Sequence, residues 1–208
     1  ARSLIGLVED LGTGPVVMAG YDIGSRIAQA VARTRPDLVR ALILAPPLPG
    51  IGKRILTPNA QHEFWYQSFH QLALCEQLIA DEISARTYLA HFWNHWSGPG
   101  FVLDGSHLDR LAYSYSAPGA FRASIAWYRA GAGSIATSAD ESPPPAEERI
   151  QPSTTVLWPS HDPLFPRAWS DRLDQYFCDF VIRPVSGAGH FAPLEYPQLV
   201  ADAIADTS

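Results

Sequence analysis

The chain has 208 residues, and its 47% hydrophobic and 17% charged content is typical of a folded protein with room for one substantial core. A net charge of −6 without a Lys/Arg run argues against nucleic-acid binding, and the lack of an apolar stretch of about 20 residues argues against a membrane span. Two cysteines, Cys75 and Cys178, make no disulfide framework and favour a reducing, cytoplasmic location.

The first 48 residues follow the order helix, strand, helix, strand. Apolar residues at helical spacing predict a helix over residues 1–11, and the apolar run 16–19 predicts a strand buried on both faces. A second helical pattern over residues 25–33 leads into another buried strand at 41–45. This order is the unit of a parallel sheet, so the pattern predicts an α/β fold.

The middle of the chain has a different character. Between residues 50 and 133 the apolar pattern is helical and rich in large aromatic side chains, and residues 138–152 predict an exposed loop. We therefore expect a helical cap over residues 49–145, inserted between two parts of the core, residues 1–48 and 146–208.

The sheet pattern then resumes. Residues 155–158 predict a strand, 167–176 a helix, 180–183 a last strand and 194–205 a closing helix. The sequence thus predicts four parallel strands in total.

Asp22 lies in the pentapeptide Gly-Tyr-Asp-Ile-Gly, between the strand at 16–19 and the following helix. A sharp strand-to-helix turn exposes one side chain at the top of a sheet, and the glycines before and after it give room for that turn. The pattern predicts a nucleophile elbow with aspartate as the nucleophile. The plainer alternative is an aspartate that caps the helix.

Two later residues complete a candidate triad. Asp162 follows the strand at 155–158, and His190 follows the strand at 180–183. Both therefore belong to the carboxyl edge of a parallel sheet, where such sheets bind ligands. The chain order of nucleophile, acid and histidine is the one expected for a hydrolase triad, although each residue alone could be an ordinary loop residue.

At this point a resemblance is evident. The segment Gly20–Arg26, together with Asp162, the Gly-His-Phe around His190, Glu195 and Pro197, resembles the α/β-hydrolases that use an aspartate nucleophile. These are the epoxide hydrolases and the haloalkane and haloacetate dehalogenases. The resemblance covers essentially the whole chain, and it implies an α/β-hydrolase fold in which helices flank a parallel sheet and a cap covers it.

An aspartate nucleophile narrows the chemistry. Attack by a carboxylate on a saturated carbon gives an ester that water can cleave, so Asp22 suits the displacement of an epoxide oxygen or a halide. His190, oriented by Asp162, would activate the water, and the backbone N–H of Ile23 would donate to the ester oxyanion. No cofactor is needed. His91 and His95 share a helical spacing, but no third ligand is evident, so we expect no metal site.

The leaving group decides between the alternatives. The resemblance implies that two cap tyrosines, Tyr66 and Tyr128, donate to an epoxide oxygen, although both could simply be packing aromatics. Haloalkane dehalogenases carry a tryptophan where Ile23 stands, and haloacetate dehalogenases use an arginine at the position of Arg26, which could instead pair with a nearby acid. The balance favours epoxide hydrolysis, with dehalogenation as the alternative and a silent ligand-binding member of the fold as a second one.

The cap aromatics indicate an apolar pocket. We expect Trp65 and Phe191 to contact the substrate, which would be a small apolar epoxide, and a role in detoxification would fit such a substrate. The oligomeric state is open, with a homodimer as one option.

The run 16–19 is apolar at every position, so both of its faces should be covered. The fold that the chain resembles places further strands beside this run, and nothing else in the sequence supplies them. We therefore expect the first strands to be absent, with one edge of the strand at 16–19 unpaired or filled by another chain. A second oxyanion donor would be absent with them, so the isolated chain is expected to be poorly soluble and inactive.

Overall fold

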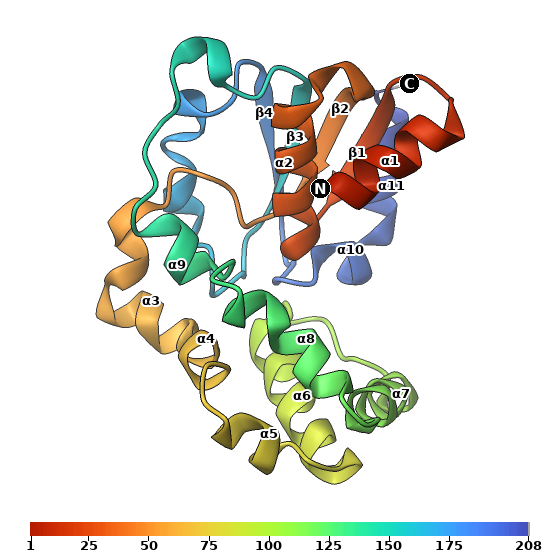
Figure 1. Ribbon diagram of the computed structural model, residues 1–208, viewed down its shortest axis with the longest axis vertical. Coiled ribbons are helices and arrows are strands. Elements are labelled where there is room, and N and C mark those ends of the chain that lie inside the picture. The colour runs from red at the N-terminus through yellow and green to blue at the C-terminus, as the bar shows by residue number, and fades with distance from the viewer. Residues whose placement is uncertain (208) are drawn as a thin grey trace.

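A computed structural model describes residues 1–207 and shows a parallel four-stranded sheet with the order β1-β2-β3-β4. The strands run over Val16–Gly20, Val39–Leu44, Ser153–Pro159 and Phe180–Val185 (Figure 1). Four parallel strands in this chain order confirm the sequence-based prediction of the sheet.

Burial divides the inner strands from the outer ones. β2 and β3 are buried along almost their whole length, as their continuous apolar runs predict. β1 pairs only with β2 among residues 1–207, so its side chains do not reach the expected burial on both faces. Met18 is buried, whereas Val16 and Val17 are half-buried and Ala19 is exposed. β1 therefore forms an edge of the sheet, and the strands expected beside it remain a prediction.

Helices cover both faces of the sheet. On one face, Val8 of α1 (Arg2–Leu11) and Val31 of α2 (Ile23–Thr34) share a core with Leu42 of β2. On the other, Ile43 packs with Ala203 of α11 (Pro197–Ala205), which follows the short helix α10 (Ala192–Glu195). Successive residues of a strand point to opposite faces, so neighbouring residues of β2 enter different cores. A short 3-10 turn, η1 (Pro36–Leu38), joins α2 to β2.

Two predicted helices are broken. The helix expected over residues 167–176 is two 3-10 turns, η4 (Arg167–Ser170) and η5 (Leu173–Gln175), because the residues between and after them make tertiary contacts instead. The carboxylate of Asp171 pairs with Arg54 at 2.7 Å. The helix expected over residues 194–205 is split into α10 and α11 at Tyr196, since Pro197 disfavours a helical backbone in the residue before it.

The chain between β2 and β3 is helical and lies at the carboxyl ends of the strands (Figure 1); we call this segment the cap. Its own core joins residues of several helices, among them Cys75, Phe121 and Ile125. No helix in residues 1–207 is both long and apolar enough to cross a membrane. The elements of this segment are η2 (Gly52–Leu56), α3 (Pro58–Glu63), α4 (Trp65–Phe69), α5 (Leu74–Leu78), α6 (Glu82–Trp96), α7 (Gly105–Ser116), α8 (Ala120–Arg129), α9 (Ser134–Ser138) and η3 (Ala146–Glu148).

Phe64 packs the cap against the core, so its replacement should destabilise the protein more than replacement of its neighbour Trp65. Its side chain is fully buried, and its ring packs edge-on against that of Phe165 in the core, with the ring centroids 5.5 Å apart. Phe64→Ala should lower the free energy of unfolding by about 3–5 kcal/mol through lost burial and a cavity. Trp65→Ala is the control and should cost much less, because Trp65 is 40% exposed. Urea unfolding measures both, and equal losses would contradict the assignment.

Candidate active site

Asp22 lies in a strained turn between β1 and α2. Its backbone has φ 48° and ψ −126°, and it is the one non-glycine residue with positive φ in the described part of the chain. Such a conformation persists only where the surroundings impose it, and it is common at functional sites. The Asp22 N–H donates to the carbonyl of Pro46 at 3.0 Å, which ties the turn to the segment after β2. The sharp strand-to-helix turn expected at Asp22 is therefore present, and the role of Asp22 as a nucleophile stays a prediction.

The two glycines of the turn differ in their importance. A Cβ on Gly20 would lie 2.5 Å from the carbonyl oxygen of Gly24, so the end of β1 and the start of α2 can approach only because Gly20 has no side chain. A Cβ on Gly24 would meet no atom within 4 Å. The expectation that both glycines make room is correct for Gly20 and wrong for Gly24.

The structure brings His190 and Asp162 together. Asp162 follows β3, and His190 lies in the loop after β4. Their side chains are almost fully buried, and Nδ1 of His190 lies 3.0 Å from Oδ2 of Asp162. The other carboxylate oxygen of Asp162 accepts from the N–H of Leu164 at 2.9 Å, so the acid is held from two sides. Because Asp162 engages Nδ1, Nε2 is the nitrogen left for acid–base work.

The charges of the three residues depend on one another. Burial by itself lowers the pKa of His190, but the charge and hydrogen bond of Asp162 and the charge of Asp22 raise it, and the net shift is upward. Burial raises the pKa of Asp22, against the opposing effects of His190, Arg26 and the N–H of Ile23. The imidazole and the two carboxylates thus form one coupled electrostatic unit.

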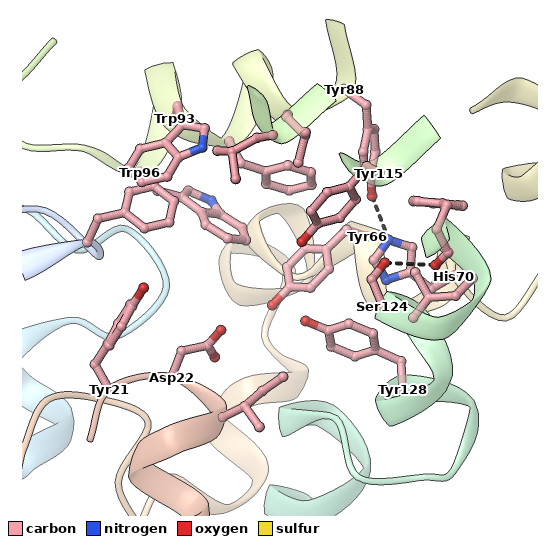
Figure 2. Close-up of a pocket in the computed structure, with 17 residues that line it drawn as sticks. Tyr21, Asp22, Tyr66, His70, Tyr88, Trp93, Trp96, Tyr115, Ser124 and Tyr128 are labelled. Atoms are coloured by element: carbon pink, nitrogen blue, oxygen red, sulfur yellow. Dashed lines mark hydrogen bonds between the residues drawn. The ribbon is translucent and has the colours of Figure 1, made fainter. Parts of the chain in front are cut away.

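A cavity of about 290 Å³ separates Asp22 from the cap, and Figure 2 shows its lining. Asp22 and Ile23 form its floor, while helices α4, α6, α7 and α8 supply most of its walls. Aromatic side chains predominate. The lining residues are Tyr21, Asp22, Ile23, Tyr66, His70, Tyr88, Leu89, Phe92, Trp93, Trp96, Leu111, Tyr115, Phe121, Ser124, Ile125, Tyr128 and Phe191.

Tyr66 of α4 and Tyr128 of α8 meet above Asp22. Their rings lie edge to face with centroids 5.6 Å apart, and Figure 2 shows both hydroxyl groups directed toward the Asp22 carboxylate. Burial is the main cause that raises the pKa of each phenol, and the charge of Asp22 adds to it. Both tyrosines therefore stay protonated at neutral pH. An amide N–H of Gln67 donates to the Tyr66 oxygen at 3.2 Å, so the Tyr66 hydroxyl keeps its own O–H as a donor, and it also interacts with the hydroxyl of Tyr128.

The two residues expected to contact substrate have different positions. Phe191 lines the cavity and stacks on Trp93 with centroids 3.8 Å apart. Trp65 does not line the cavity; it lies on the outside of the cap, parallel to Phe92. Successive residues of a helix point about 100° apart, so Tyr66 and Trp65 of α4 face different directions, and here only Tyr66 faces the cavity.

Arg26 matches neither role that its sequence position suggests. It does not line the cavity, so it is not placed to hold a substrate carboxylate there. Within residues 1–207 it also has no carboxylate within 4.0 Å, and one of its guanidinium nitrogens donates to the Ser134 hydroxyl at 3.3 Å instead.

His95 pairs with the carboxylate of Glu63 at 2.6 Å on the cap surface, and His91 stacks beside it.

Several cavity residues were not anticipated from the sequence. His70, Tyr88 and Tyr115 line the cavity, and Nε2 of His70 lies 2.7 Å from the Tyr88 hydroxyl. Burial and the charge of Arg129 lower the pKa of His70 to about 4, so its imidazole is neutral at neutral pH. The sequence did not single out these three residues, because the cap contains many other aromatic residues that lie on other faces of its helices.

Known proteins with a similar sequence or structure have the same fold. The model of the family described as "Alpha/beta hydrolase family" matches residues 1–203, and no curated protein matches the chain. Among solved structures, Cfl2 from Burkholderia cenocepacia is 21% identical with a TM-score of 0.78, and the match covers 99% of this chain and 69% of Cfl2. An epoxide hydrolase from metagenomes of hot environments is 24% identical with a TM-score of 0.77, and the match covers 99% of this chain and 72% of that one. A Bacillus megaterium epoxide hydrolase is 19% identical with a TM-score of 0.74, and the match covers 99% and 73%.

The different roles of the two glycines can be tested by adding one methyl group to each. Gly20→Ala should lower both the free energy of unfolding and any activity of the site, because its Cβ would push α2 away from β1 and displace Asp22. Gly24→Ala is the matched control; it should be neutral or stabilise by up to about 1 kcal/mol, since alanine favours the helix more than glycine. Thermal unfolding of the two variants measures the difference, and a stable Gly20→Ala protein would argue against the strained elbow.

Proposed function

The chain belongs to the alpha/beta hydrolase family, and we propose that it opens small apolar epoxides to vicinal diols through an ester on Asp22. One observation carries this proposal. Two protonated tyrosine hydroxyls, from Tyr66 and Tyr128, face the Asp22 carboxylate across a cavity that is large enough for a small organic molecule. A nucleophile on one side and two O–H donors on the other are what the opening of an epoxide ring requires.

The first step would form the ester. A carboxylate oxygen of Asp22 attacks an epoxide carbon from behind, the carbon–oxygen bond of the ring breaks, and its electron pair stays on the leaving oxygen. A proton from Tyr66 or Tyr128 neutralises that oxygen. Hydrogen bonds that strengthen as charge develops lower the barrier, and buried donors are the most effective because they need no reorganisation.

The second step would hydrolyse the ester. His190 removes a proton from water, the hydroxide adds to the ester carbonyl, and the N–H of Ile23 donates to the oxyanion. The carbonyl re-forms as the ester bond to the substrate oxygen breaks. The departing oxygen takes the proton of the newly added hydroxyl group, so the diol leaves and Asp22 is a carboxylate again. The proton that His190 received finally restores the tyrosine. Asp162 supports this step because its negative charge stabilises the imidazolium.

Dehalogenation by the same aspartate is the alternative. A halide ion needs N–H donors, and the side chain of Ile23 supplies none. Arg26 lies outside the cavity wall, which argues against haloacids. Trp93 and Trp96 do line the cavity and carry indole N–H groups, so a substrate panel should contain haloalkanes beside epoxides. Binding without turnover throughout such a panel would favour a silent member of the family.

The two-step scheme predicts different failures for Asp22 and His190. Asp22→Asn should abolish turnover because no ester can form, whereas His190→Gln should stop the reaction after the ester. Intact-protein mass spectrometry of the His190→Gln variant with an epoxide should show the protein plus one substrate mass, which peptide mapping assigns to Asp22. A label on another residue, or no label at all, would reject the scheme.

The tyrosine pair predicts a graded loss of ring opening. Tyr66→Phe or Tyr128→Phe should slow ester formation by about 10²–10³-fold, the loss typical of one oxyanion donor, and the double variant should nearly stop it. Tyr113→Phe is the control, because Tyr113 lies on α7 with 71% of its surface exposed. Single-turnover rates measure ester formation directly. If the tyrosine variants behave like the control, the assignment of the oxygen donors is wrong.

A further inference from the structure

The loop that carries His190 is in direct contact with the end of cap helix α6. We call residues 187–190 the base loop and Trp96–Gly98 the cap segment. The N–H of His190 donates to the carbonyl of Trp96 at 2.7 Å. A Cβ on Gly189 would overlap the Trp96 carbonyl, and a Cβ on Gly98 would overlap the Gly187 carbonyl. The two backbones can touch because both positions are glycines.

Glu195 bridges these two backbones. It is the last residue of α10, and its Oε2 accepts from the N–H of Gly98 and from the N–H of Gly189, each at 2.9 Å. Its other oxygen, Oε1, is buried with no hydrogen-bond partner in the part of the chain that the structure describes. A buried carboxylate oxygen without a partner destabilises the fold. Such a local cost is typical of residues that serve the function of a site.

We propose that Glu195 is a positioning residue that holds His190 in place for hydrolysis of the ester, without taking part in formation of the ester. This inference rests on the proposed function. Gly189 directly precedes His190, so the hydrogen bond from Gly189 to Glu195 restricts the backbone from which the imidazole projects. The second hydrogen bond, from Gly98, joins that backbone to the cap segment.

None of the groups that would form the ester is hydrogen-bonded to Glu195 in the described residues; one indirect link is the Tyr66 ring, which packs edge-on against Trp96 of the cap segment with centroids 5.2 Å apart. Asp22 is held by the turn after β1 and by the carbonyl of Pro46. Tyr66 and Tyr128 belong to α4 and α8, and the contacts of Glu195 are with the base loop and the cap segment instead. Loss of the bridge should therefore affect the step that needs His190 and spare the step that does not.

Glu195 also acts on His190 through its charge. Burial lowers the pKa of His190, whereas the charges of Asp162, Asp22 and Glu195 raise it. The ring of Tyr21, which carries an uncharged phenol, also faces the imidazole edge-on. Once Asp22 is esterified its charge is gone, and the carboxylates of Asp162 and Glu195 remain. His190 must be neutral to act as a base, so ester hydrolysis falls as the pH drops through its pKa. Removing the charge of Glu195 should move this fall to lower pH.

The experiment follows one turnover with styrene oxide by rapid quenching and intact-protein mass spectrometry. Glu195→Ala removes the bridge, Glu195→Gln keeps an acceptor oxygen but removes the charge, and Asp202→Ala, an exposed carboxylate on α11, is the matched control. In Glu195→Ala the ester should form at the wild-type rate and decay on the order of tenfold or more slowly, since a misplacement of about 1 Å can cost about 100-fold. In Glu195→Gln the acid limb of ester decay should move to lower pH, which a purely structural residue would not cause.

Ester decay at the wild-type rate in Glu195→Ala, or equal slowing of formation and decay, would overturn the inference. If Glu195→Ala does not fold, as judged by circular dichroism, Glu195→Gln decides, and an unmoved acid limb rejects the proposal. Gly98→Ala is an independent check, because its Cβ would force the cap segment from the base loop and should likewise slow decay alone. If the wild-type protein itself forms no ester with an epoxide, the proposed function fails, and this result is distinct from a failure of the role of Glu195.

Discussion

The close approach of β1 and α2 at Gly20 is the constraint on which the site depends. A Cβ added to Gly20 would lie 2.5 Å from the carbonyl oxygen of Gly24. Because glycine has no Cβ, the chain can turn from strand to helix within two residues. That turn forces Asp22 to positive φ and projects its carboxylate above the carboxyl edge of the sheet. The loops after β3 and β4 lie at the same edge because the strands are parallel, so Asp162 and His190 meet there, and the charges of both affect the pKa of Asp22.

The cap completes the site by supplying what the core lacks. The core brings two carboxylates and an imidazole, all of them charged or able to become charged, whereas the cavity-facing side of the cap is aromatic and carries neutral hydroxyl groups. Burial keeps the phenols of Tyr66 and Tyr128 protonated, and the nearby charge of Asp22 acts in the same direction. The negative charge on one side of the cavity therefore favours the protonated, donating state of the phenols on the other side.

The cap must hold its position relative to the core for this arrangement to work; of three contacts, the first and the last join the cap to the core, and the second joins the two ends of the cap. Phe64 packs against Phe165, Glu141 accepts from the N–H of Gly50 at 2.8 Å, and Glu195 joins Gly98 to the loop of His190. The first of these stabilises by apolar burial, and the other two connect backbones through a carboxylate. Burial raises the pKa of Glu141, against the opposing effect of the backbone N–H groups around Gly50, so this linkage is part of the electrostatics of the cap base as well.

The amino-acid sequence by itself determined the sheet, the sharp turn at Asp22 and the positions of Asp162 and His190 after strands, because these depend on local patterns: apolar runs, a glycine two residues before Asp22, and polar residues directly after strands. The tertiary structure decided what depends on residues far apart in the chain. It turned Tyr66 toward the cavity and Trp65 away from it, gave Arg26 a hydroxyl partner 108 residues away, and broke the segment after Pro166 where Asp171 meets Arg54. It also joined Glu195 to Gly98, a pair 97 residues apart that no periodicity links. Local preference sets where a helix or strand forms, but the direction of a side chain on that element is chosen by the surfaces that pack against it.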